Sequence, residues 1–243
     1  MKFGIILRRE LKSYFATPIA YVFIFIFLVL ANVFTFYLGN FYERQQADLI
    51  PFFSFHPWLY LFLIPAISMR LWSEERKTGT LELLMTLPVS RRDIVLGKFL
   101  AAWLFAGLAL VLTIPLWITV NYLGEPDNGV IFASYLGSWL MAGGFLAIGS
   151  CMSALTRSQV IAFVLCGFVC LIFVMAGFPL VLDVFKGWVP IIVLDTVASL
   201  SFLTHFNAVS RGVLSLQDFL YFVSVITVWL LAASIVLDIK KGG

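Results

Sequence analysis

Residues 18–39 read PIAYVFIFIFLVLANVFTFYLG and contain no charged side chain. A helix needs about 20 consecutive apolar residues to cross the hydrocarbon core of a bilayer, so this stretch is long enough to span a membrane. The whole chain has the same character, because 62% of its 243 residues are hydrophobic and only 12% are charged. Soluble domains carry roughly 25% charged residues. This composition excludes a soluble enzyme and predicts a membrane protein with several spans.

Five further apolar stretches have the length of a span. The predicted fold is therefore all-α and polytopic, with six transmembrane helices at about 18–39, 51–72, 94–123, 131–154, 160–182 and 219–237. In the fourth span, Gly143, Ala147 and Cys151 form a row of small residues at four-residue spacing. Such rows let helices approach closely. We expect this row to serve packing within the chain rather than a dimer interface.

Residues 1–16 precede the first span and have a different pattern. Phe3, Leu7, Leu11 and Phe15 recur every four residues, while basic residues such as Arg8 lie away from that stripe. A basic amphipathic helix of this kind lies on an anionic membrane surface. We therefore predict an interfacial helix on the cytoplasmic side.

Residues 188–209 are long enough for a seventh span, but an aspartate at position 195 would cost about 2.5–3.5 kcal/mol near a helix centre. With six spans and a cytoplasmic N-terminus, 13 of the 16 basic residues lie inside and only Arg44, Lys186 and Arg211 lie outside. This distribution obeys the positive-inside rule. We expect both termini in the cytoplasm and an outer excursion at 183–218 that dips into the membrane or lies on it.

The most charged part of the chain connects the second and third spans. Residues 70–98 read RLWSEERKTGTLELLMTLPVSRRDIVLGK. Gly79 allows a turn, Thr80 can cap a short helix with an apolar face, and Pro88 ends it. Ser90 and Asp93 then have the spacing of a helix cap that begins the third span. The apolar face of the short helix suits either the bilayer interface or a groove in a soluble partner.

Several motifs resemble those of a known family. Glu74-Glu75-Arg76, Gly79-Thr80-Leu81-Glu82 and Leu87-Pro88-Val89-Ser90 resemble the signature of ABC type-2 exporter permeases. The similarity is to the branch of the gliding-motility permease and the permease of nitrous-oxide-reductase maturation. Arg211-Gly212-Val213 and the stretch from Asp218 to Phe222 are similar to that branch as well.

The resemblance implies a permease of the bacterial inner (plasma) membrane that works as a dimer, with a second copy or a homologous chain. It implies a coupling helix between spans two and three that binds a cytoplasmic ABC ATPase subunit. It also implies an amphipathic helix before the first span and a membrane-dipping hairpin between the last two. Within the coupling segment 73–93, the residues assigned to ATPase coupling are Glu74, Glu75, Arg76, Gly79, Thr80, Leu81, Glu82 and Leu84.

No G-x-x-x-x-G-K-[ST] loop occurs in the sequence, so the chain lacks the motif that cradles nucleotide phosphates. We expect no cofactor or metal on this chain, and ATP and magnesium on the partner ATPase. The net charge of +3 is too small to suggest nucleic-acid binding. We also expect no catalytic residue.

Three residues of the outer excursion, Asp195, His205 and Arg211, are candidates for an outer gate or docking surface. One alternative function is an ATP-driven mechanotransmission complex that acts on an extracytoplasmic partner or accessory subunit. A remote alternative is an intramembrane enzyme that uses His56, His205 or Asp195. The sequence shows no paired acid and base that would favour an enzyme.

Overall fold

The computed structural model of the chain describes residues 2–81, 90–186, 188, 190–213 and 215–239, and among these residues there is no β-strand. The expected all-helical class is confirmed. The helices are α1 (Lys2–Ala16), α2 (Pro18–Val33), the π-helix η1 (Phe34–Leu38), α3 (Ile50–Ser54), α4 (His56–Ser68), α5 (Arg70–Thr78), α7 (Arg91–Val111), α8 (Ile114–Leu123), α9 (Asn128–Leu155), α10 (Gln159–Met175), α11 (Pro179–Phe185), α12 (Ile191–Ser199), α13 (Phe202–Ser210) and α14 (Leu216–Ile239).

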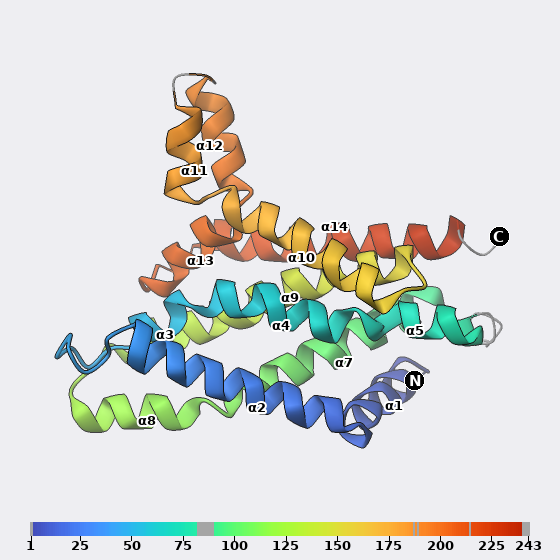
Figure 1. The fold of residues 1–243 in the computed structure, drawn as a ribbon, viewed down its shortest axis with the longest axis horizontal. Helices are drawn as coiled ribbons and strands as arrows, with labels where there is room; N and C mark the ends of the chain where they lie inside the picture. Colours follow the sequence, from blue (N-terminus) through green and yellow to red (C-terminus); the bar gives the residue numbers. More distant parts are fainter. Residues whose placement is uncertain (1, 82–89, 187, 189, 214, 240–243) are drawn as a thin grey trace.

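The helix α9 forms the centre of the bundle. Every residue from Leu140 to Ala154 is buried, on all sides of the helix. The helices α4, α5, α7, α10, α13 and α14 pack around it, as Figure 1 shows. A helix that is apolar on every side belongs in such a position. Gly143 lies against Trp103 and Ile226, so the small residues of α9 are used for packing within the chain.

Four continuous helical stretches are long and apolar enough to cross a membrane. They are Pro18–Leu38, Arg91–Leu123, Asn128–Leu155 and Leu216–Ile239. Two helix pairs meet the same criteria when each is joined across a sharp bend, α10 with α11 at 71° and α12 with α13 at 68°. By length and composition the described residues therefore give four to six candidate spans.

The predicted second span, 51–72, is divided among α3, α4 and α5. Single-residue breaks at Phe55 and Met69 separate these helices, and none of them alone reaches the length of a span. Figure 1 shows the three helices following one another along the long axis of the molecule. Pro57 lies in the first turn of α4, where its missing N–H costs no hydrogen bond. Pro65 lies inside α4, and the break follows four residues later at Met69, whose N–H donates to the Pro65 carbonyl.

The predicted fifth span, 160–182, also differs from the structure. The helix ends at Met175 and the chain bends into α11. Within the outer excursion, α11 and α12 lie side by side and project away from the bundle, as Figure 1 shows. Many apolar side chains of these two helices are exposed, for example Ile192 at 79%. α13 then returns to pack against α9 and α14.

The helix α1 forms where the amphipathic pattern predicted it, and it packs against α7. Ile6 is buried against Gly97 of α7, and Tyr14 stacks on Phe105 with ring centroids 5.1 Å apart. Phe15, which belongs to the predicted apolar stripe, is 38% exposed, and its ring centroid lies 5.9 Å from that of Phe105. Ile6 and Tyr14 are not in that stripe, so α7 contacts α1 mainly beside it. Contact of α1 with a membrane surface stays a prediction.

Candidate functional site

A buried lysine joins three helices at the end of the bundle where α5 lies. Lys98 of α7 is 5% exposed. Its Nζ lies 2.8 Å from Oε1 of Glu75 on α5 and 3.2 Å from Oε2 of Glu10 on α1. The same Nζ lies 5.4 Å from the ring centroid of Trp72, within the range of a cation–π contact. We call these four residues, Glu10, Trp72, Glu75 and Lys98, the Lys98 cluster.

Hydrogen bonds attach the first turns of α5 to α9. The Trp72 indole Nε1 donates to the Ser150 hydroxyl at 2.9 Å. The backbone N–H groups of Trp72 and Ser73 donate to Oγ of Ser153 at 3.0 and 3.1 Å. That hydroxyl in turn donates to the Met69 carbonyl at 2.8 Å. One serine of α9 therefore satisfies backbone groups on both sides of the break between α4 and α5, as buried backbone polar groups require.

A second contact fixes the later part of α5. Arg76 Nη1 donates to the Ala154 carbonyl at 2.6 Å, in the last turn of α9. The last carbonyls of a helix lack partners within the helix, and a cation there is favourable. Glu74, by contrast, is half exposed and makes only a loose pair with Arg70 at 3.7 Å. Of the three consecutive charged residues predicted to act in coupling, Glu75 and Arg76 thus hold α5 in place.

A glycine turn ends α5. Gly79 has a φ of 73°, in the left-handed region that favours glycine. Thr78 and Thr80 flank it with hydroxyls 2.9 Å apart, and Leu81 packs against the hydrophobic core. Two of the predicted coupling residues, Glu82 and Leu84, lie outside the described residues, as does most of the predicted short helix.

The chain is described again from Ser90, which caps α7 as its spacing with Asp93 predicted. The Ser90 hydroxyl accepts a hydrogen bond from the Asp93 N–H at 3.2 Å. Both ends of the predicted coupling segment therefore lie in defined elements. These are α5, with its glycine turn, and the capped start of α7, which carries Lys98 two turns further on.

The electrostatics of the Lys98 cluster depend on all of its charges. Burial alone would raise the pKa of Glu10, but the charges of Lys98 and Arg9 and their hydrogen bonds hold that pKa below its usual value. Glu10 is therefore an ionised group that must keep its partners. Sequence reasoning treated Lys98 as one of many cytoplasmic charges and gave Glu10 no role. The available signal was a lysine inside the predicted span 94–123, because ionisable residues there are rare and usually paired.

At the opposite end of the bundle, a second buried pair joins α13 and α14. His205 Nδ1 lies 2.6 Å from Oδ1 of Asp218, and its Nε2 lies 2.8 Å from the Ser199 carbonyl. The Tyr221 ring stacks on the imidazole at 3.8 Å. The Ser215 hydroxyl donates to the other oxygen of Asp218 at 2.5 Å. Each nitrogen of His205 thus faces an acceptor, and the pair fixes the start of α14.

The three candidate residues of the outer excursion are not brought together. His205 is buried, whereas Asp195 on α12 and Arg211 after α13 are exposed. In the part of the chain that the structure describes, no contact links Asp195 to His205. Arg211 lines a separate cavity of about 500 Å³ beside Asp127, at the start of α9. Their role as an outer gate or docking surface stays a prediction.

The pair of His205 and Asp218 supports a stability prediction. His205→Gln is expected to lower the free energy of unfolding by about 1–2 kcal/mol, because the two acceptors face different ring nitrogens, one amide nitrogen cannot reach both, and one buried bond is lost. The melting temperature of the purified protein in mild detergent measures the loss. Asn207→Gln, at an exposed position of the same helix, serves as the control. Equal melting temperatures of the two variants would contradict the proposed role of the imidazole.

His56 lies inside the bundle rather than near its surface. The residue is fully buried, and its Nδ1 lies 2.8 Å from the Ser138 hydroxyl of α9. Tyr60 shares that hydroxyl at 2.7 Å. No group of three His, Cys, Asp or Glu side chains that could hold a metal ion occurs among the described residues. The Nε2 of His56 is buried and has no hydrogen bond among the described residues.

The fold and the site together define a helical membrane protein whose central helix is tied to a short charged helix at one end. A family model for the ABC-2 family transporter protein matches residues 6–239. The match covers nearly the whole chain, so the chain belongs to this family. No curated protein matches the chain significantly. Membership of this family supports the prediction that the chain is a transporter permease. It also supports the predicted partnership with an ABC ATPase subunit.

Proposed function

We propose that the chain is the permease subunit of an ABC exporter, and that a separate ATPase drives it through segment 73–93. Two permease chains, either two copies or two homologous chains, and two ATPase subunits form the proposed working unit. ATP and magnesium are bound by the ATPase, and the permease contributes coupling and a pathway rather than catalysis. The proposed location is the bacterial inner membrane, with both termini in the cytoplasm.

The Lys98 cluster is the observation that carries this proposal. α5 contains the first residues of the coupling segment and is held to α1, α7 and α9 by buried ion pairs and hydrogen bonds. Packed interiors transmit displacement because they have few voids. A push on the segment after Gly79 would therefore move these four helices together rather than bend α5 alone.

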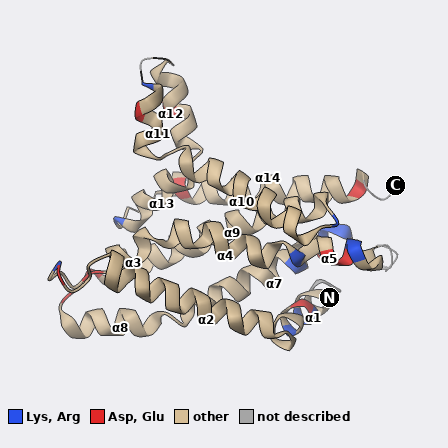
Figure 2. Cartoon of the chain, in the orientation of Figure 1, with Lys and Arg blue, Asp and Glu red and all other residues tan. Residues whose placement is uncertain are grey.

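The distribution of charge supports the proposed orientation. Figure 2 shows Lys and Arg gathered at the end of the bundle where α5 lies. The start of α1 and the end of α14 lie at that same end. Since the side rich in basic residues faces the cytoplasm, this end would meet the ATPase.

Gly79→Val should uncouple the ATPase while leaving the permease inserted and folded. A β-branched residue disfavours the left-handed conformation that turns the chain out of α5. We expect at least a several-fold loss of permease-stimulated ATP hydrolysis in liposomes that contain both subunits. Asn40→Val is the control, because Asn40 is exposed, also has a left-handed φ of 47° and lies between η1 and α3, away from α5. Equal stimulation by both variants would contradict the assignment of the coupling segment.

The mechanotransmission alternative rests on the exposed hairpin of α11 and α12, which would dock an extracytoplasmic partner or accessory subunit. ATP-dependent accumulation of a solute or lipid by sealed vesicles would favour the exporter. ATP hydrolysis that depends on an outer partner and moves nothing across the vesicle membrane would favour the alternative.

A further inference from the structure

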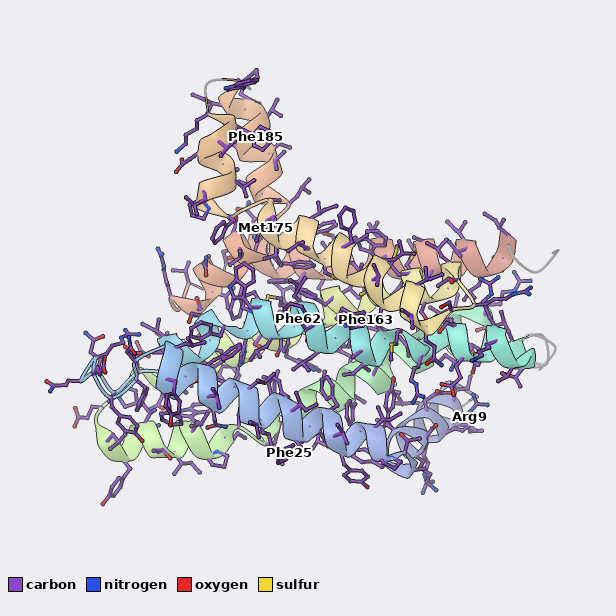
Figure 3. The ribbon with its side chains drawn as sticks, in the orientation of Figure 1. Arg9, Phe25, Phe62, Phe163, Met175 and Phe185 are labelled. Carbon is purple, nitrogen blue, oxygen red and sulfur yellow. The ribbon has the colours of Figure 1, made fainter. Side chains whose placement is uncertain are left out.

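A groove opens along the outside of the bundle beside the Lys98 cluster. It has a volume of about 550 Å³ and is formed by α1, α2, α4, α5 and α7. Its walls from α2 and α4 are apolar and include Ile19, Val22, Ile26, Leu63 and Ile67. The three α2 residues are 39–54% exposed, so the mouth of the groove opens on the outer surface of α2. Figure 3 shows Phe25 on the same helix, and that side chain is 68% exposed.

The groove changes character along its length. At the α5 end it is lined by three cations and three carboxylates: Arg9, Arg70, Lys98, Glu10, Glu74 and Glu75. Ile19 and Ile26 lie about 10 Å apart along α2, at 1.5 Å per residue. The groove therefore presents a charged end, formed by α1 and α5, followed by an apolar wall that enters the predicted first span. An occupant that fits must be charged at one end and apolar along the rest.

Two buried polar atoms at the charged end have no hydrogen bond among the described residues. They are Oε2 of Glu75 and Nε of Arg70, and the latter has only the loose 3.7 Å ion pair with Glu74. Lys98 is already shared between Glu10 and Glu75. A buried carboxylate oxygen and a buried guanidinium nitrogen without hydrogen bonds are costly. What they lack is a donor to Oε2 of Glu75 and an acceptor closer to Nε of Arg70 than Glu74 is.

We propose that this groove binds one membrane phospholipid whose headgroup carries both a phosphate and a primary ammonium. The phosphate lies between Arg9 and Arg70, because guanidinium groups bind phosphate well and each has further N–H groups besides the one paired with Glu10 or Glu74. The ammonium donates to Glu75, and one acyl chain follows the apolar wall of α2 and α4. This binding site goes beyond the coupling function and does not depend on it.

Because Glu75 needs a hydrogen-bond donor, the proposed site should be selective among lipids. A primary ammonium can donate hydrogen bonds to Glu75, whereas a trimethylammonium group has no N–H to donate. A glycerol headgroup has the phosphate but no cation. The groove should therefore prefer phosphatidylethanolamine over phosphatidylcholine and over phosphatidylglycerol, although all three have the same acyl chains.

Native mass spectrometry of the purified full-length permease, incubated in turn with each of these three lipids, tests the site. The ATPase is absent, so failure here leaves the proposed coupling function untouched. We expect one tightly held phosphatidylethanolamine, at least about five-fold more abundant than the adduct of either other lipid. Arg70→Gln should reduce that adduct several-fold.

A volume-filling variant locates the site. Ala66 lines the groove from α4, and Ala66→Phe should abolish the preferred adduct. Ala232→Phe is the matched control, because Ala232 is a partly buried alanine of α14 that does not line the groove. Equal adducts for the three lipids, or full binding by Ala66→Phe, would overturn the proposal. Loss of dimers in Ala66→Phe with unchanged lipid adducts would make the groove an interface between copies and would also overturn it.

Discussion

Lys98→Met is expected to lower the free energy of unfolding by about 3 kcal/mol and to uncouple ATP hydrolysis. The lysine is 5% exposed and neutralises both Glu10 and Glu75. Removing one partner of a buried ion pair costs about 3–5 kcal/mol, because the remaining charge is left without compensation. The two carboxylates have side chains 13% and 19% exposed, so partial hydration places the cost at the lower end. Unfolding of the purified protein in detergent mixed with sodium dodecyl sulfate measures it.

Removing the two carboxylate charges together with the lysine provides the control for this prediction. A triple variant, Lys98→Met with Glu10→Gln and Glu75→Gln, removes the uncompensated charges and should recover most of the lost stability. It should not recover coupling if the ion pairs transmit motion between α1, α5 and α7. Lys12→Met removes an exposed charge from α1, outside the coupling segment, and should leave both properties unchanged. Equal stability of Lys98→Met and Lys12→Met would show that the cluster has no structural role.

Composition and apolar length predict much of this fold because a bilayer imposes them on any spanning helix. The stretches 18–39, 131–154 and 219–237 each fall almost wholly within a continuous helical stretch of the structure. The Ser90 cap and the Gly79 turn also follow from local rules, since each depends on residues adjacent in sequence. These features need no knowledge of the neighbouring helices.

The rest depends on contacts between distant residues. The break at Met69 is satisfied by Ser153, 84 positions along the chain, and no local pattern reveals that partner. For the same reason the sequence did not predict the pairing of Lys98 with Glu10, which is 88 positions away. It did not predict the pairing of His205 with Asp218 either, and Asp195 was considered as the partner instead. A charge in a membrane protein can be flagged from sequence, but its partner is set by how the helices pack.

Gly149→Ala should destabilise the bundle by about 3 kcal/mol, at the upper end of the usual cost of overpacking. A Cβ at this position of α9 would overlap the Ser68 side chain of α4 and lie 3.1 Å from Sγ of Cys166 on α10. Three helices meet there, so neither neighbour can withdraw without opening its other contacts. In an exposed helix the same change would be favourable by about 1 kcal/mol. The sign of the measured change in melting temperature therefore separates packing from helix propensity.

Two further variants show whether the Ser68 contact is the cause. Gly167→Ala adds the same methyl group to α10, where the nearest atom outside the helix is 4.0 Å away, and it should be neutral or stabilising. Ser68→Gly removes the atoms that the new methyl would meet, so adding it to Gly149→Ala should recover stability beyond the sum of the single changes. If the two changes only add, the clash with Ser68 is not what limits substitution at position 149. If Gly167→Ala is as harmful as Gly149→Ala, the cost comes from side-chain bulk anywhere in these helices, and the close approach of α4 to α9 has no special role.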